Sequence, residues 1–298
     1  MTKEEKLIWL YLYICEAHDT ELCLHCQRMS NNYAPKFSDA ELITTYLFAI
    51  IEQKSLTIKS IHRFISRYWQ SWFPELPSYQ KYAFRLNRLS EVFPALVERV
   101  CRAASNAGVY QQISLVDSLP IIIAGPKRTQ SAKVAPSLCD KSYCASKGLW
   151  YYGVKLHLLA WCRPASLPFP EYAGLTPASE HDLTAFKRIA NRLNEREIYA
   201  DKAYFDRELK KSLENHNNTR LNTSIRMVRC QKLEHSDDKL FSGIVSKIRQ
   251  PLESLFHWIN EKTGIQNASK VRSEIGLNIH VFGKLAAAMI MLTFRFLN

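Results

Sequence analysis

The stretch EIYADKAYFD, residues 197–206, places a carboxylate directly after an apolar segment. Its first four residues, 197–200, predict the end of a half-buried β-strand. Asp201 follows at the last position of that strand, where a carboxylate at the edge of a core carries a free-energy cost. Either Asp201 caps the helix that follows, or its carboxylate holds something charged.

A second strand poses the same question. The β-branched run QISLVDS, residues 112–118, ends at Asp117. If the two strands are neighbours, both carboxylates meet at one edge of a sheet. Each aspartate alone is also compatible with a turn or a helix N-cap. Two aspartates in similar positions favour a shared site, although the capping interpretation stays open for both.

The rest of this part of the chain alternates between strands and helices. Residues 149–162 alternate like a long strand, and 124–148 form a long basic loop of the kind that is functional or disordered. We expect further strands at 168–177 and 219–225 and helices at 181–194, 205–217, 248–263 and 271–296. This order predicts a mixed α/β domain.

The first 110 residues carry helical periodicity instead. We expect helices at 3–17, 39–53 and 57–69, and a long one from Ser78 to about residue 107. Ser38 and Glu41 form the sequence pattern of a capping box. The chain is therefore predicted to contain an all-α N-terminal domain, 1–110, followed by an α/β domain, 111–298.

Charge is distributed unevenly between these two parts. The net charge is +12, with 13 Lys and Arg against 11 Asp and Glu in residues 1–110 and 27 against 17 in the remainder. A strongly basic C-terminal part favours a polyanionic partner, most often nucleic acid. Solubility alone is the other explanation of the charge.

The cysteines and the apolar runs indicate in which cellular compartment the protein is expected. There are eight cysteines and no recognisable export signal, so we expect reduced thiols and a cytoplasmic protein. The motif CLHC, 23–26, lacks a second ligand pair at zinc-finger spacing and is interpreted as buried thiols, with a zinc site as the alternative. The apolar run 285–294 is too short to span a bilayer and predicts a buried helix without a membrane partner.

A third carboxylate lies in the expected helix 248–263. Leu252, Leu255, Phe256 and Ile259 form its core stripe, and Glu253 borders that stripe. Glu253 is either in a salt bridge with Arg249, four residues earlier, or aimed at the edge of the sheet. Pro251 is expected in the first helical turn, which places Arg249 before the helix.

Three carboxylates that converge repel one another unless cations neutralise them. Hard oxygen ligands suit Mg²⁺ or Mn²⁺, and such ions suit in-line displacement at phosphorus. The basic surface would then hold the nucleic acid whose phosphate is attacked. Charge and carboxylates thus point to the same chemistry.

Four motifs in this order resemble the DDE transposases of bacterial insertion sequences: LVDSLP (115–120), GVKLHLL (153–159), YADKAYFD (199–206) and IRQPLESLF (248–256). The upstream stretch LPSYQKYAFRLNRL, 76–89, resembles the Pro-Ser-Tyr helix of such enzymes. One branch of the family carries a Tyr and a Lys near its glutamate where this chain has Ser246 and Asn260, so the branch stays open.

The resemblance implies a ribonuclease-H-like mixed sheet flanked by helices, without a large insertion domain. It implies that Asp117, Asp201 and Glu253 hold two Mg²⁺ or Mn²⁺ ions. Water would free a 3′-OH at each inverted-repeat end of the element, and that 3′-OH would attack target DNA. The implied partners are double-stranded DNA and further copies of the chain, in a nucleoid-associated setting.

The resemblance also suggests supporting residues. Arg249 would steady a phosphate or Glu253, and Lys155, His157 and Lys202 are candidates to touch the DNA backbone. Lys81, Arg85 and Arg88 are candidates for recognition of the element ends. For each cation an ordinary solvated role is the alternative, and His157 is equally compatible with a hydrogen-bonded strand histidine.

Three other functions stay open on the sequence. The first is a metal-dependent nuclease on the same core that cuts without joining. The second is a DNA-binding protein that has lost catalysis, against which the three intact carboxylates speak. The third is a zinc-dependent regulator that uses the CLHC motif.

Overall fold

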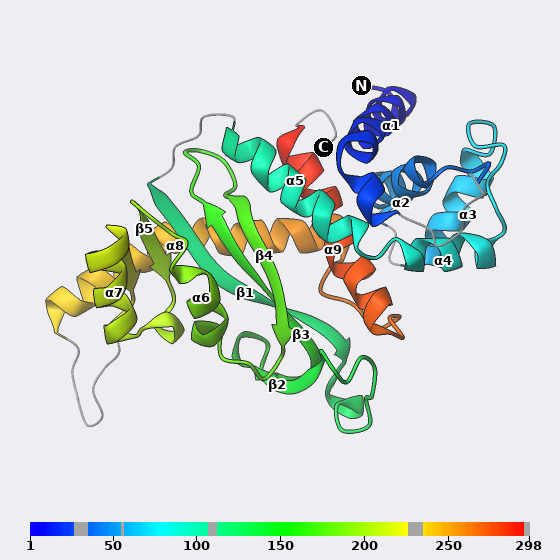
Figure 1. Ribbon diagram of the computed structural model, residues 1–298. Coiled ribbons are helices and arrows are strands. Elements are labelled where there is room, and N and C mark those ends of the chain that lie inside the picture. The colour runs from blue at the N-terminus through cyan, green and yellow to red at the C-terminus, as the bar shows by residue number, and fades with distance from the viewer. Residues whose placement is uncertain (27–34, 55–56, 107–111, 226–234, 295–298) are drawn as a thin grey trace. The chain divides into compact units, whose positions relative to one another are not determined.

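The computed structural model describes residues 1–26, 35–54, 57–106, 112–225 and 235–294 (Figure 1). The chain divides into two compact units. The sheet unit comprises 105–132 and 136–258, and the helical unit comprises 1–104, 133–135 and 259–298. The predicted boundary between residues 110 and 111 lies outside the described residues. The assignment of separate functions to 1–110 and 111–298 stays a prediction.

Six strands of the described chain form one mixed sheet: β1 (Ile113–Ala124), β2 (Asp140–Cys144), β3 (Leu149–Trp161), β4 (Phe169–Pro177), β5 (Glu197–Ala200) and β6 (Arg220–Thr223). Their order is β2-β3-β1-β5-β6, and β4 also pairs with β3. The β1–β3 and β3–β4 pairs are antiparallel, whereas β5 runs parallel to β1 and to β6. This mixed order is the predicted ribonuclease-H-like class of fold.

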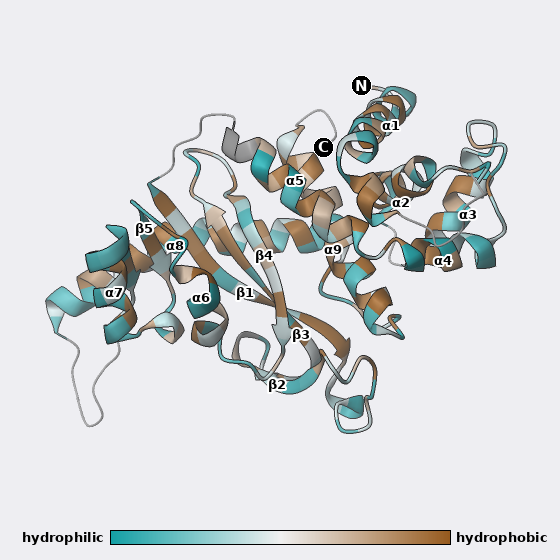
Figure 2. Cartoon of the chain, viewed as in Figure 1, coloured by the Kyte–Doolittle hydropathy of each residue, from teal (hydrophilic) through white to brown (hydrophobic). Residues whose placement is uncertain are grey.

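Helices α6 (Asp182–Ala190) and α7 (Arg207–Asn217) provide the parallel crossovers of the sheet unit. Figure 1 shows α6 on one face of the sheet, while α8 (Ser236–Thr263) crosses behind it. Figure 2 shows hydrophobic residues recurring along β1 and β3. The core between the sheet and the crossover helices contains Val116, Leu159, Phe186, Ile189, Ile198, Tyr204, Leu213 and Leu221.

Two boundaries in the sheet unit differ from expectation. The strand β1 does not end at Asp117 but continues to Ala124, because the long β3 pairs with it along almost its whole length. Its pairing with β5 ends earlier, at Val116. Similarly, α8 begins at Ser236 and keeps Pro251 in its interior, where the loss of one N–H donor costs about 3 kcal/mol.

Buried side chains on both sides of Pro251, Val245 before it and the fully buried Leu252 and Leu255 after it, anchor α8 across the proline. Because Arg249 lies inside this helix rather than before it, Arg249 and Glu253 lie on one helical face. Part of the expected irregular loop, 124–148, is also ordered as the edge strand β2.

The described helices of the other unit are α1 (Lys3–Thr20), α2 (Asp39–Gln53), α3 (Ile58–Tyr68), α4 (Tyr79–Arg88), α5 (Val92–Asn106) and α9 (Glu274–Thr293). The capping box at the start of α2 is confirmed, since Glu41 N donates to Ser38 Oγ at 3.1 Å and Ser38 N donates to Glu41. The single long helix expected from Ser78 is wrong. It is broken before Pro94, which fits the first turn of a new helix.

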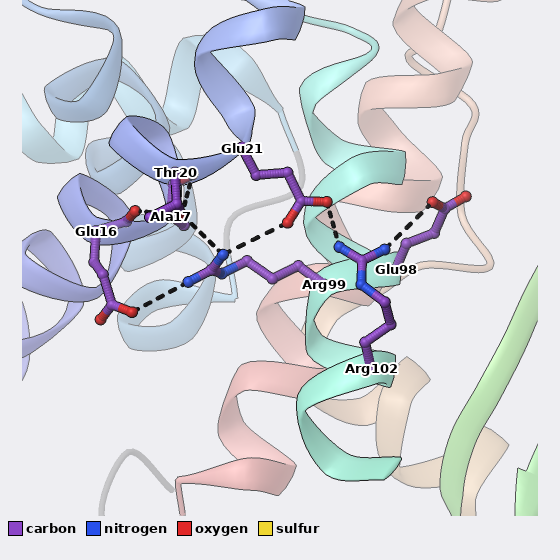
Figure 3. Close-up of polar contacts among 7 residues, drawn as sticks. All are labelled: Glu16, Ala17, Thr20, Glu21, Glu98, Arg99 and Arg102. Carbon is purple, nitrogen blue, oxygen red and sulfur yellow. Dashed lines mark hydrogen bonds and ion pairs between the residues drawn. The ribbon is translucent and has the colours of Figure 1, made fainter. Parts of the chain in front are cut away.

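Arginines of α5 connect that helix to the C-terminal end of α1 (Figure 3). Arg99 donates to Thr20 Oγ1 at 3.0 Å and to Glu16 Oε1 at 3.3 Å, and Arg102 pairs with Glu21. These pairs lie at the surface, so each adds little to the stability of the folded state. They do consume positive charge that would otherwise be available to a ligand.

Helix α9 has the length and composition of a membrane span, but 78% of its most apolar window is buried inside the structure. The predicted buried helix at 285–294 is therefore confirmed, as the later part of α9. Gly283 allows α9 to lie close to Tyr46. A Cβ atom at that position would lie 2.6 Å from the ring of Tyr46 on α2.

Candidate active site

Asp117 and Asp201 occupy aligned positions directly after the last paired residues of β1 and β5. Val116 pairs with Ala200 at the end of the β1–β5 ladder, and the two aspartates come directly after that pair. Asp201 also caps the short 3₁₀ turn Lys202–Tyr204, because its Oδ1 accepts from Lys202 N at 2.7 Å. The capping role of Asp201 therefore does not move its carboxylate away from Asp117.

Arg249 connects the third predicted carboxylate to the first. Its Nη1 donates to Asp117 Oδ2 at 2.6 Å, and its Nη2 donates to Glu253 Oε1 at 2.8 Å. Asp117 points toward α8 because Val116, its neighbour on β1, packs on the opposite face with α6. The salt bridge between Arg249 and Glu253, one of the two arrangements that the sequence left open, is present, and Arg249 shares it with Asp117.

The electrostatic environment of Asp117 is unusual for an aspartate. Burial raises the pKa of its carboxyl from 3.8 to about 6. The Arg249 guanidinium and the backbone N–H of Ser118 oppose that increase, while Asp182 and Asp201 add to it. Two further carboxylates, Asp182 and Asp201, therefore act on Asp117, and Arg249 is the cation that pairs with Asp117 and Glu253.

Two residues of this site were not predicted from the sequence. Asp182, the first residue of α6, contributes negative charge next to Asp117. The hydroxyl of Tyr204 is buried, has no hydrogen-bond partner within the described structure, and lies within electrostatic range of Asp117 and Arg249. For Asp182, the only sequence feature that indicates a site residue is its position at a helix start after a strand, and this feature is weak. For Tyr204, the only such feature is its position in the motif YADKAYFD.

The other predicted residues of the sheet unit have separate partners. Lys155 donates to Asp182 Oδ1 at 2.9 Å and to the carbonyl of Glu180 at 2.8 Å. His157 is 6% exposed and hydrogen-bonded to Thr176 Oγ1, and burial lowers its pKa to about 4, so it is neutral near pH 7. Lys202 is exposed and has no side-chain partner among the described residues.

The three cations predicted on the Pro-Ser-Tyr helix are not equivalent. Arg85 forms an ion pair of 2.8 Å with the buried Asp39, so it is committed to the structure of the helical unit. Lys81 and Arg88 are exposed on α4 and make no ion pair within the described part of the chain.

The donor set has the chemistry of a divalent-cation site but is arranged around Arg249. Carboxylate oxygens are the ligands that Mg²⁺ and Mn²⁺ prefer. However, no three His, Cys, Asp or Glu side chains in the described ranges are close enough together to hold a metal ion. A cation would therefore compete with Arg249 for Asp117 and Glu253. At the CLHC motif, Cys26 is buried and Cys23 is partly buried.

The sheet order places the chain in the ribonuclease-H-like class of folds, with an acidic cluster at its central strands. A family model described as a transposase DDE domain matches residues 107–272, which is more than half of the chain. The chain therefore belongs to the DDE transposase family. Transposase domains of this family generally use divalent metal ions.

A comparison with curated proteins found no match. Among solved structures, the chain is similar to one described as the crystal structure of a pre-cleavage Mos1 transpososome. That likeness has 15% sequence identity and a TM-score of 0.21, over 89% of this chain and 81% of the other. A likeness this distant adds nothing to the family assignment.

Proposed function

We propose that this chain is a DNA transposase of an insertion sequence, which frees the 3′-OH ends of its element by hydrolysis and joins them to target DNA. One observation carries the proposal beyond the family assignment. Asp117 and Asp201 are aligned on neighbouring strands, and Arg249 connects Asp117 to Glu253 over 2.6 and 2.8 Å. This is an acidic centre with its own internal cation.

Asp117, Asp201 and Glu253 are the residues that would hold two Mg²⁺ or Mn²⁺ ions. Bound there, the ions would supply charge neutralisation and a more acidic bound water. Until then Arg249 keeps Asp117 and Glu253 compensated. Once released from Asp117, its guanidinium is free to bind a phosphate oxygen, a pairing that arginine geometry favours.

Two displacements at phosphorus follow one another in this proposal. In the first, a water oxygen bonds to phosphorus, the bond from phosphorus to O3′ breaks, and O3′ leaves as a hydroxyl. In the second, that hydroxyl loses its proton and attacks a target phosphodiester, whose own O3′ leaves. Each step exchanges one P–O bond for another, so no oxidant and no covalent enzyme intermediate is required.

The DNA partner is proposed from charge and exposure. The net charge of +12 favours a polyanion, and the exposed Lys202 lies beside Asp201. We propose Lys202 for the backbone near the reacting phosphate and Lys81 and Arg88 for the element end. Lys155, His157 and Arg85 are omitted because each side chain has a hydrogen-bond partner within the protein. A homo-oligomer on the two ends is part of the same proposal.

The test uses purified full-length protein, MnCl₂, a linear DNA that carries the sequence flanking the coding region, and a supercoiled target plasmid. The expected result is a product in which the 3′ strand of the end is covalently joined to the plasmid. Nicked DNA without joined product would instead identify a nuclease. Transposition in cells that survives Asp117→Ala would contradict a catalytic role for the acidic centre.

A further inference from the structure

A cavity in the helical unit has no role in the chemistry proposed above. Its volume is about 380 Å³, and it is lined by Tyr46 of α2, by α3, α4 and α9, and by residues 270–273. Four cations line it and none of its lining residues is acidic; the cations are Lys59, Lys270, Arg272 and Lys284. We call it the Lys284 cavity. A cavity whose charged lining residues are all positive has the electrostatics of an anion site.

Lys284 is the strongest evidence for a missing anion. Its side chain is 2% exposed, and its Nζ donates to the carbonyl of Gly264 at 3.3 Å. No carboxylate in the described structure pairs with it. A buried ammonium without a counter-ion is costly, and burial accordingly lowers the pKa of Lys284 to about 7. An anion in the cavity would provide the absent charge.

Further residues of α9 line the cavity beside Lys284. Gly276, His280 and Lys284 recur every four residues and so share one face of α9. Gly276 lines the cavity without a side chain. His280 binds the carbonyl of Ile265 at 2.8 Å, and burial lowers its pKa to about 3, so it contributes no charge near neutral pH.

The rim supplies further donors from other elements. Lys59 and Lys270 are exposed and have no ion-pair partner among the described residues. Arg272 is held in place by the carbonyls of Ser269 and Val271, at 2.9 and 2.7 Å. The cavity is thus a cluster of cations from three segments of the chain.

A row of cations continues from the cavity along α3. Lys59, Arg63 and Arg67 recur at steps of four, about 6 Å apart along the helix axis, and all three are exposed. These three cations line a shallow hollow next to the cavity. Tyr79 lines both the hollow and the cavity. A row of cations suits a polymer of phosphates better than a single small anion.

We propose that the Lys284 cavity binds a backbone phosphate of DNA, and that Lys59, Arg63 and Arg67 hold the adjoining phosphates. The identity of the polyanion as DNA rests on the proposed transposase function. The contact with phosphate does not depend on catalysis by Asp117, so the two proposals can fail separately.

The test measures binding of double-stranded DNA by fluorescence anisotropy, without divalent metal and at several salt concentrations. The variants are Lys284→Met, Lys59→Gln and, as a matched control, Lys211→Met on the exposed surface of α7 in the sheet unit. We expect Lys284→Met to weaken binding about tenfold or more and Lys59→Gln to lower the salt slope by about one. The control should change affinity less than twofold.

Equal loss of affinity in Lys284→Met and Lys211→Met would overturn the proposal. Because Lys59 is exposed, Lys59→Gln tests it even if Lys284→Met fails to fold, and an effect no larger than the control would also overturn it. A second arm compares thermal unfolding in inorganic phosphate and in chloride at equal ionic strength. Stabilisation by phosphate that Lys284→Met abolishes, with unchanged DNA binding, would assign the cavity to a free phosphate and contradict the DNA assignment.

If joined DNA products never form but Lys284→Met still weakens DNA binding, the proposed transposase reaction fails and the DNA-binding cavity stands. If joined products form and Lys284→Met binds DNA like the control, the proposed transposase reaction stands and the DNA-binding cavity fails. The two proposals are therefore distinguishable with the same purified proteins.

Discussion

Arg249 on α8 and Asp117 on β1 form an ion pair of 2.6 Å between groups 132 positions apart in the sequence. Both side chains are mostly shielded from water, at 16% and 21% exposure. The same guanidinium reaches Glu253, which is 58% exposed. Arg249 thus neutralises part of the negative charge of Asp117 and Glu253. A divalent cation that binds these carboxylates would replace Arg249 in that role.

Asp117→Asn should remove strand joining. The neutral amide keeps the shape of the side chain but loses one of the carboxylates proposed to bind divalent ions. We expect at least a 100-fold decrease, on the order of the losses that follow changes at metal centres. Joined product per hour is the measurement, with Asp237→Asn on the exposed part of α8 as the control. Equal activity of both variants would refute the assignment.

Arg249→Met should make the protein depend more strongly on divalent ions for its stability. Without the guanidinium, Asp117 and Glu253 have no internal cation. We expect the increase in Tm on addition of MgCl₂ to be larger in this variant than in wild type. Arg188→Met, which removes a surface pair with Glu180, is the control and should respond like wild type. Identical magnesium shifts in all three proteins would argue against a cation site around Arg249.

The stability of the helical unit should depend on pH through Lys284. Its pKa is lowered from 10.5 to about 7, so between those values the unfolded chain binds more protons than the folded one. The free energy of unfolding therefore rises with pH in this window, by up to about 1.4 kcal/mol per pH unit. The difference between wild type and Lys284→Met, from urea unfolding at pH 7 and 9.5, isolates the effect.

The groups that face Lys284 do not reverse this sign. His280 has a pKa lowered to about 3 and stays neutral across the window. Lys59, Lys270 and Arg272 line the same cavity and are present in both proteins, so they cancel in the difference. If the free energy of unfolding of wild type, relative to that of Lys284→Met, decreased as pH rises, Lys284 would not be a buried cation without a counter-ion.

Asp39→Ala should destabilise the protein strongly, because it leaves the mostly buried Arg85 without its carboxylate. The Nε atom of Arg85 already lacks a partner in the described structure. Breaking such a buried pair costs about 3–5 kcal/mol. Chemical unfolding provides the measurement. A loss below about 1 kcal/mol would return Arg85 to the solvated cations that are free to bind DNA.

Gly283→Ala should also destabilise the helical unit, since the new methyl group would lie 2.6 Å from the Tyr46 ring. Overpacking of this kind costs about 1–3 kcal/mol. The matched control is Gly243→Ala in α8, where a Cβ atom meets nothing within 4 Å and the change should be neutral or stabilising. Equal effects on Tm would mean that α2 and α9 do not pack as described.

The sequence by itself determined the features that local periodicity encodes. Apolar runs predicted strands before Asp117 and Asp201, although β1 continues past Asp117 to Ala124. The four-residue spacing of Arg249 and Glu253 indicated a salt bridge as one of two arrangements, and the capping box at Ser38 predicted the start of α2. In the last two cases the interacting groups lie within one helical turn, whereas the pairing of the strands beside Asp117 and Asp201 was not predicted.

Only the tertiary structure decided which partner each charged group takes. The pairing of Arg249 with Asp117, of Lys155 with Asp182, and of Arg85 with Asp39 joins residues 132, 27 and 46 positions apart. The cavity around Lys284 likewise requires α3, α4 and α9 together. Periodicity reports which face of an element is buried, but it carries no information on which distant element covers that face, and the partner of a buried charge depends on that alone.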